Sequence, residues 1–415
     1  MLTDNKNINW KWNLFLMWLS QLLVLAGFAA VMPFIPLFIK DELHIADDGV
    51  RGVWISVFHF LGSFGYAVFC PIWGALSDRF GVKPMLLRGT FGTALIFPLM
   101  AWAGSPLWLS ILRFASAACA GTTAAAQILL VKNTPEDKQG FALGVLSTAV
   151  WSGAMLGNVL GGLIVHYYGY KATFIICGVM YFLAGFLVLP ARENFKKTAV
   201  QTLKKPHFSM PMLPKFTSAV WMIITMMFVA GFVRYLEVPY LAMQIEIIAG
   251  AEKAAYWTGI ISAFVSVGAL LSGMLTGYLS DKYKPLYILI PSFVITVITL
   301  LIQAYSRDLF IFGFSRTLMY LAGGGVFSVL QKMLTAAAPK RKRGKVFGFS
   351  STAHSGGVML STVAAGGVIY IFNVQAVFIT AAVLTALMIP FFISGMRQLM
   401  RQKYFSTQFN RLFEK

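Results

Sequence analysis

The sequence predicts an all-α polytopic membrane protein in which twelve transmembrane helices form two pseudo-symmetric six-helix bundles. Of the 415 residues, 58% are hydrophobic and only 12% are charged, whereas soluble domains average about 25% charged residues. Apolar runs of about 20 residues, long enough to cross a bilayer, recur along the whole chain. The second half of the sequence also repeats features of the first half. These three observations exclude a water-surfaced globule and predict the fold class.

The apolar runs define the helices in chain order. The expected spans are 12–39, 52–74, 85–104, 107–131, 141–165 and 170–190, followed by 217–243, 256–279, 286–305, 308–334, 346–371 and 374–395. A stretch rich in lysine and proline separates the two sets of six. We therefore expect an N-terminal bundle over 1–190, a cytoplasmic linker over 191–216, a C-terminal bundle over 217–396 and a basic cytoplasmic tail over 397–415.

Lysine and arginine are distributed unequally between the two sides of these helices. The even-numbered connections, the linker and both termini contain most of them, for example Arg79, Lys132 and Arg341, whereas the opposite loops contain mostly acids, such as Asp47 and Glu252. Cytoplasmic loops carry the excess of lysine and arginine in membrane proteins. Both termini are therefore expected in the cytoplasm, and the chain in the cytoplasmic (inner) membrane.

The same distribution accounts for the formal net charge of +19. The basic residues occupy short connections rather than one clustered face, so no nucleic-acid partner is expected. Cys70, Cys119 and Cys177 lie inside apolar runs, without the spacing of a disulfide framework or a metal site. The sequence therefore implies no cofactor and no metal.

An internal repeat relates the two halves. A shift of about 203 positions aligns Pro36 with Pro239, Gly74 with Gly277, Asp78 with Asp281 and Arg113 with Arg316, and a shift of 204 aligns Gln127 with Gln331 and Gly153 with Gly357. Two homologous bundles indicate a parallel repeat about an axis along the membrane normal, with a substrate site near the midplane between them. Rocking of the bundles would expose that site to each side in turn.

The repeat includes a charged turn after the second helix of each half, GALSDRFGVKP at 74–84 and GYLSDKYKP at 277–285. Glycine permits a tight turn, and charged groups at helix ends interact with backbone dipoles. We expect these turns to hold one of two rocking states. The gating residues expected are Gly74, Asp78, Arg79, Gly81, Lys83, Gly277, Asp281 and Lys282.

Across essentially the whole chain these patterns resemble the major facilitator superfamily. The turn at 74–84 matches that family's loop motif between the second and third helices, and GFAAVMPFIP at 27–36 resembles the motif that ends the first helix of drug exporters. GAMLGNVLGG at 153–162 resembles the fifth-helix antiporter motif through Gly153, Gly157, Gly161 and Gly162, with Asn158 where that motif has proline. The chain is similar to the drug:proton antiporter group with twelve spans, notably the MdtG-type multidrug exporters.

Ionisable groups inside a bilayer cost at least about 2.5 kcal/mol on insertion scales, so each one needs a reason. Arg113 and Arg316 occupy repeat-equivalent positions on the fourth and tenth helices, which the resemblance implies face the central cavity. We expect them to bind an anionic group or to tune a proton carrier. Bonds to backbone carbonyls that hold the bundle together are the structural alternative.

Glu237 is the only carboxylate expected inside a span, and Arg234 lies three residues earlier, in a position to pair with it. Glu237 is therefore the first candidate for a proton carrier, with a salt bridge near the outer end of the helix as the alternative. His354, near the middle of the eleventh helix, is a second candidate because histidine changes charge near neutral pH. The alternative is a neutral histidine that bonds to a neighbouring helix.

Four further polar residues, Gln21, Asn158, Gln127 and Gln331, fall inside the apolar runs. They are candidates for contacts in the substrate cavity, together with Arg113 and Arg316. Hydrogen bonds between helices would explain them equally well.

The resemblance implies a secondary active transporter: proton-coupled efflux of amphipathic drugs or related small molecules by rocker-switch alternating access. The alternative is a facilitator or symporter for an organic anion that uses the Arg113/Arg316 pair. An enzyme is not expected, because the chain contains no serine-hydrolase, zinc-protease or P-loop motif. The expected partners are a small-molecule substrate, protons and the lipid bilayer, and the expected functional unit is a monomer.

Overall fold

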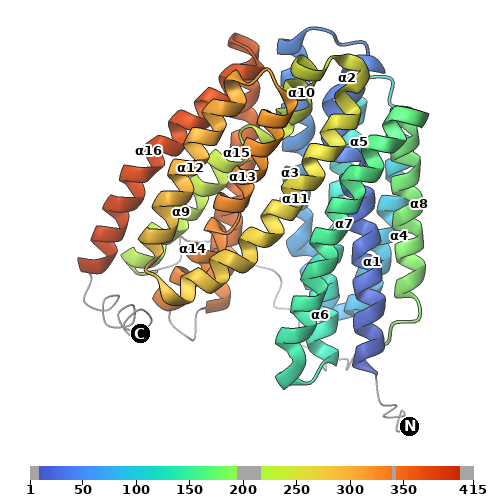
Figure 1. Ribbon diagram of the computed structural model, residues 1–415. Coiled ribbons are helices and arrows are strands. Elements are labelled where there is room, and N and C mark those ends of the chain that lie inside the picture. Colours follow the sequence, from blue (N-terminus) through green and yellow to red (C-terminus); the bar gives the residue numbers. More distant parts are fainter. Residues whose placement is uncertain (1–8, 194–215, 339–342, 402–415) are drawn as a thin grey trace.

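The computed structural model describes residues 9–193, 216–338 and 343–401, and within these ranges all regular elements are helical (Figure 1). Most of the expected linker, 191–216, and most of the expected tail, 397–415, lie outside the described residues. The two halves of the chain form separate groups of helices that stand side by side in Figure 1. They converge at the end where α2 and α10 lie and diverge toward the end that carries both chain termini.

The N-terminal half contains α1 (Trp10–Val31), η1 (Met32–Phe34), α2 (Ile35–Asp41), α3 (Asp48–Phe80), α4 (Val82–Met100), α5 (Pro106–Cys119), α6 (Thr122–Asn133), η2 (Glu136–Lys138), α7 (Gln139–Tyr168) and α8 (Tyr170–Val188). The C-terminal half contains α9 (Ser218–Arg234), η3 (Val238–Tyr240), α10 (Leu241–Ala249), α11 (Ala251–Lys282), α12 (Pro285–Tyr305), α13 (Leu309–Gly323), α14 (Val326–Ala337), α15 (Arg343–Ile371) and α16 (Val374–Arg401).

Four of the expected spans are broken helices, at equivalent places in the two halves. The first and seventh spans change to short 3₁₀ turns at Pro33 and Pro239, because proline removes a backbone donor and clashes with the preceding helical turn. The fourth span breaks at Gly121, whose φ of +110° suits glycine, and the tenth breaks between Gly323 and Val326. Counted this way, the described residues make twelve membrane traverses, six in each half.

Eleven of these traverses are long and apolar enough to cross a membrane, as judged over the described residues. The 19-residue α4 is the traverse outside that group. Several helices extend beyond the expected spans at the end near the termini: α3 reaches Phe80, α11 reaches Lys282 and α16 reaches Arg401. The apolar runs locate the membrane-buried parts of the helices and not their full lengths.

The charged turns differ from the expectation in one respect. Gly74 and Gly277 lie inside α3 and α11, with no atom near the place of a Cβ, so they do not form the turns. In the first half Gly81 makes the turn, with a φ of +95°. The side chains of Asp78 and Asp281 lie outside the described residues.

The first charged turn is bound to the segment that follows α8. The carboxylate of Glu193 accepts hydrogen bonds from the backbone N–H groups of Val82 and Lys83, each at 2.8 Å, and so caps the N-terminus of α4. The Lys83 Nζ also donates to the Leu189 carbonyl oxygen at 2.6 Å. These contacts fasten the turn to the end of the N-terminal half, just before the linker.

The most extensive contacts between the halves are made by two equivalent helix pairs, α7 with α11 and α3 with α15. In the first pair, a Cβ on Gly162 would lie 3.0 Å from the Gly259 Cα, and in the second a Cβ on Gly366 would lie 2.1 Å from the Ser56 Oγ. The repeat shifts of 204 and 203 relate Gly162 to Gly366 and Ser56 to Gly259. The interface therefore follows the pseudo-symmetry of the sequence.

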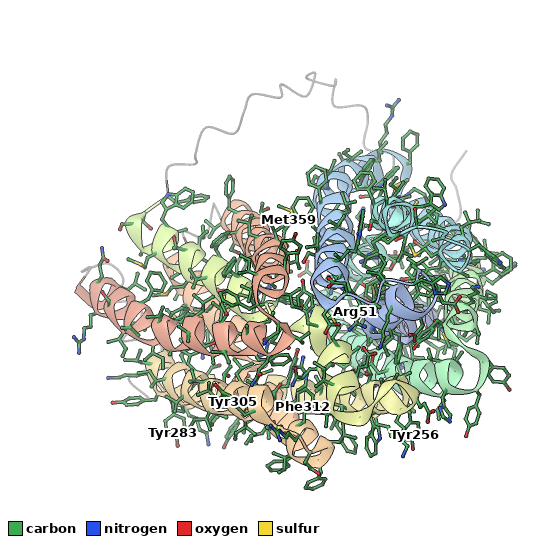
Figure 2. All side chains as sticks on the ribbon, turned by 90° about the horizontal axis from the view of Figure 1, so that it is seen from above. Arg51, Tyr256, Tyr283, Tyr305, Phe312 and Met359 are labelled. Carbon is green, nitrogen blue, oxygen red and sulfur yellow. The ribbon has the colours of Figure 1, made fainter. Side chains whose placement is uncertain are left out.

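Ion pairs close the interface at the end that carries α2 and α10. The Glu246 carboxylate of α10 is 8% exposed; it lies 2.8 Å from Arg51 Nη1 and also pairs with the Lys40 Nζ. Both cations belong to the other half. Figure 2 looks down on this end and labels Arg51 where the halves meet. Close by, the Tyr240 and Ser56 hydroxyl oxygens lie 2.5 Å apart, again across the interface.

Candidate substrate cavity

Two adjoining cavities occupy the space between the halves. One, of about 560 Å³, is bounded mainly by the N-terminal half, and the other, of about 400 Å³, mainly by the C-terminal half. Tyr235, Val238 and His354 line both of them. Each cavity also includes residues of the opposite half, as expected for a site between two repeats.

Arg113 is the charged residue of the cavity in the N-terminal half. It comes from α5, and its guanidinium lies over the rings of Phe28 and Phe58, with centroids at 5.1 and 5.7 Å. Gly62 of α3 leaves room for it, since a Cβ there would lie 2.6 Å from the Arg113 Nε. His59 lines the same wall. The aromatic faces hold the guanidinium by cation–π attraction, and among the described residues no aspartate or glutamate lines this cavity.

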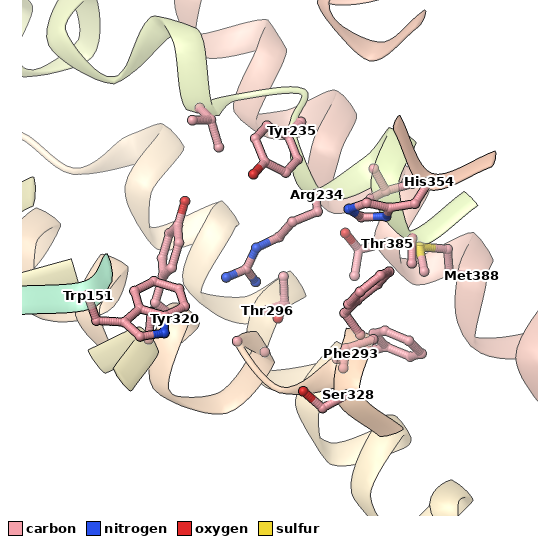
Figure 3. Close-up of a pocket in the computed structure, with 18 residues that line it drawn as sticks. Trp151, Arg234, Tyr235, Phe293, Thr296, Tyr320, Ser328, His354, Thr385 and Met388 are labelled. Carbon is pink, nitrogen blue, oxygen red and sulfur yellow. The ribbon is translucent and has the colours of Figure 1, made fainter. Parts of the chain in front are cut away.

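Arg234 is the charged residue of the second cavity, which Figure 3 shows in close-up. It is the last residue of α9, and its guanidinium lies over the Tyr320 ring at 4.2 Å. In Figure 3 the side chain points between Tyr320 and Thr296, while Trp151 reaches in from the N-terminal half. Within the part of the chain that the structure describes, no carboxylate lines this cavity either.

Glu237 pairs with Arg316 rather than with its neighbour Arg234. The Glu237 Oε2 lies 2.6 Å from the Arg316 Nη2, and the two side chains are 2% and 1% exposed. The Arg316 Nη1 also donates to the Gln303 Oε1 at 2.9 Å. The chain leaves the helix after Arg234, with Glu237 just before η3, so the spacing of three residues no longer places the two side chains on one helical face.

The expected Arg113/Arg316 pair is therefore not a pair of equivalent cationic groups. Arg316 is neutralised by a buried carboxylate, whereas Arg113 lines a cavity that contains none. Tyr320 links the two sites in the C-terminal half, because Arg316 lies 5.6 Å from its ring and Arg234 lies over the same ring.

His354 lies where the two cavities meet. Its Nδ1 is 3.3 Å from the Met227 carbonyl oxygen of α9, an acceptor, so Nδ1 must carry the proton and Nε2 is free to accept or to gain one. Its ring packs on Phe327 with centroids 4.5 Å apart. His354 thus bonds to a neighbouring helix and also lines the cavity.

The four polar candidates are separate from these cavities. The Gln21 Oε1 accepts a hydrogen bond from Thr123 at 2.9 Å, and the Asn158 Nδ2 donates across the halves to the Ser262 carbonyl oxygen at 3.2 Å. Gln127 is exposed and Gln331 is half-buried. None of the four lines either cavity. Gln21 and Asn158 instead form hydrogen bonds between helices.

The glycines of the fifth-helix motif are packing positions. A Cβ on Gly153, Gly157 or Gly161 would lie 2.2–2.5 Å from backbone oxygens of α1, and Gly162 faces α11 of the other half. With no side chain, these residues let α1 and α7 approach closely, as small residues do between transmembrane helices. The motif therefore joins two helices within one half and adds one contact between halves.

Replacing Gly157 by alanine is expected to destabilise the protein by about 1–3 kcal/mol, as overpacking does. The added Cβ would meet the Ala26 carbonyl oxygen at 2.2 Å, and a helix backbone cannot move aside cheaply. Gly144→Ala, on the same helix with nothing within 4 Å, is the control; it should gain up to about 1 kcal/mol of helix propensity. Thermal unfolding of the purified variants measures both, and equal midpoints would contradict the packing role.

Sequence reasoning missed several residues of the site. Gln303 could have been identified from the sequence, because it is a polar residue inside an apolar span. Tyr320 lies four residues after Arg316 and hence on the same helical face, which was also a usable signal. No sequence pattern predicts that Tyr235 lines the cavity, because its position depends on the irregular backbone between α9 and η3.

Comparisons with known proteins agree with this architecture. The model of the Major Facilitator Superfamily matches residues 17–304 and 223–411. Two relatives, both called Multidrug resistance protein MdtG, come from Escherichia coli and Enterobacter lignolyticus. They are 29% and 30% identical over 387 residues, which cover 90% and 92% of this chain and 92% and 91% of theirs.

Solved structures of transporters share the fold. A bacterial homologue of the human lysosomal transporter Spinster, in an inward-facing and occupied conformation, superposes with a TM-score of 0.73 at 15% identity, covering 95% of this chain and 98% of that one. The nucleoside transporter NupG gives 0.77 at 13% identity, covering 92% and 99%. The broken helices, the repeat and the cavity between halves agree with these matches. The chain is a multi-pass membrane transporter, not an enzyme, and belongs to the Major Facilitator Superfamily.

Proposed function

We propose that this protein exports amphipathic compounds in exchange for protons, through the cavity between its halves. The observation that carries the proposal is a cavity bounded by both halves of a repeat, beside a buried carboxylate–guanidinium pair. The relatives are called multidrug resistance proteins, and that name supports efflux here as well.

The proposal places the protein in the cytoplasmic membrane as a monomer, with both termini in the cytoplasm. The excess of lysine and arginine on the side of the termini supports this orientation. The halves are joined by ion pairs at the opposite end, so the conformation is closed on the outer side. Transport requires rocking about this interface, which breaks the contacts at one end and forms them at the other.

Glu237 and Arg316 are the proposed proton site. Protonation of the carboxylate removes its charge, so the ion pair at 2.6 Å is lost and Arg316 is left in a buried place without a counter-charge. A buried charge without a partner is strongly unfavourable. Rearrangement around Arg316, which shares the Tyr320 ring with Arg234, would carry the change to the cavity wall.

The substrate cavity combines aromatic and apolar surface with a few polar groups. Phe28, Tyr181 and Phe293 supply rings, and Arg113 and Arg234 supply charge. Adaptable apolar surface accepts varied molecules, and the guanidinium groups favour substrates that offer a hydrogen-bond acceptor. The anion facilitator that uses Arg113 and Arg316 is disfavoured, because Arg316 is already paired with Glu237.

Purified protein in proteoliposomes tests the proposal. With an imposed pH gradient and a fluorescent amphipathic dye, we expect dye movement and proton movement in opposite directions, both abolished by a protonophore. The direction of the dye is read in vesicles of known protein orientation. Dye transport that continues unchanged after the gradient has collapsed would contradict proton coupling and would favour a facilitator.

A further inference from the structure

A third cavity, of about 690 Å³, lies within the C-terminal half, between α11, α12 and α13. No residue of the N-terminal half lines it. Its lining is largely apolar and includes Leu275, Leu279, Ile295 and Leu321. The exposed side chains of Leu275 and Tyr287 show that this groove opens to the outside of the bundle.

The hydroxyl groups of Thr276 and Ser292 in the groove offer little to a polar ligand, and those of Tyr283 and Tyr287 belong to exposed side chains. The Thr276 hydroxyl donates to the Ser272 carbonyl oxygen at 2.6 Å, and the Ser292 hydroxyl donates to the Ile288 carbonyl oxygen at 2.8 Å. Both donors are therefore used within their own helices. A molecule that fills this space must contact it mainly through hydrocarbon.

The groove has the length of one leaflet. It begins at Tyr283, in the connection between α11 and α12, and reaches Ile295. The ten residue steps from Pro285 to Ile295 rise about 15 Å along a helix, which is half of the hydrocarbon thickness of about 30 Å. The connection between α11 and α12, where the groove begins, lies at the end of the molecule where α1 begins and α16 ends (Figure 1).

Two exposed lysines flank Tyr283 at this mouth, Lys282 at the end of α11 and Lys284 before α12. Lys282 donates one hydrogen bond to the Tyr278 hydroxyl, and an ammonium group has three donors, so donors remain for a ligand. Basic residues next to a bilayer attract anionic lipid head groups. The apolar groove matches the acyl chain of a phospholipid, and the two lysines at its mouth match an anionic head group.

We infer that this groove binds one anionic phospholipid, with an acyl chain along α12 and the phosphate against Lys282 and Lys284. The inference is independent of the proposed function. It also has a consequence for the central cavity: Leu321 and Ala322 line the groove, while Tyr320 and Gly323 of the same helix line the cavity. The lipid would pack on the face of α13 that points away from the central cavity, next to the break between α13 and α14.

Native mass spectrometry of the full chain tests the site. The protein is delipidated in detergent and given phosphatidylglycerol or phosphatidylcholine with identical acyl chains. We expect one retained lipid, with phosphatidylglycerol bound about thirtyfold more tightly, because two lysines contribute at the membrane surface. Lys282→Gln with Lys284→Gln should reduce this preference nearly to unity, and Lys132→Gln, exposed on the same side of the other half, should leave it unchanged.

Filling the groove tests the acyl-chain part. Leu321→Trp and, separately, Ile295→Trp should each lose the retained lipid while the unfolding midpoint stays near that of the parent protein. Equal retention of both lipids by the parent protein would overturn the inference. So would unchanged retention in both folded tryptophan variants, or displacement of the lipid by an amphipathic dye, which would make the groove a drug site.

Discussion

Glu237→Gln is expected to abolish proton-coupled transport. The glutamine cannot ionise, and it leaves Arg316, which is 1% exposed, without a counter-charge. Loss of one partner of a buried ion pair typically costs about 3–5 kcal/mol, so a marked loss of stability is expected as well. Proton movement in proteoliposomes on addition of substrate, together with the unfolding midpoint, measures the two effects.

A double variant separates coupling from stability. In Glu237→Gln with Arg316→Met both charges are removed, so most of the lost stability should return, since apolar replacement of a whole buried pair is often neutral. Proton coupling should remain absent. Glu252→Gln, on an exposed carboxylate at the start of α11, is the control and should behave like the parent. Proton-driven transport by the stable double variant would give Glu237 a structural role only.

Glu246→Gln is expected to open the end of the molecule that carries α2 and α10. Its carboxylate joins α10 to both Lys40 and Arg51 of the other half, and it is largely buried. Truncating one partner of a buried pair at an interface typically costs about 2–5 kcal/mol. Even about 2 kcal/mol changes the ratio of closed to open molecules by roughly thirtyfold.

Distance measurements between labels at the α2/α10 end would detect this shift. Cysteines at Ala46 and Ala251, in a background without the native cysteines, place one label on each half. Glu42→Gln is a matched control, because Glu42 pairs with Lys171 at 2.9 Å within the N-terminal half. We expect a longer distance population in Glu246→Gln alone. If both variants give the parent distribution, the ion pairs do not hold the α2/α10 end closed.

The sequence by itself determined the membrane setting, the twelve traverses and the two-fold repeat. The traverses follow from composition, because a bilayer requires about 20 apolar residues for each helix. The repeat follows from residues that match at a constant shift between the two halves. Arg113 and His354 were also identified from sequence as costly groups inside spans, and both line the cavities.

Only the tertiary structure decided which charges meet. Arg234 and Glu237 are close in sequence, yet the break between α9 and η3 turns Glu237 toward Arg316, 79 positions later in the chain. The cross-half contacts of Asn158 and Glu246 likewise depend on how two bundles dock. Spacing along one helix fixes its faces, but partners on distant helices are set by packing, which no local pattern contains.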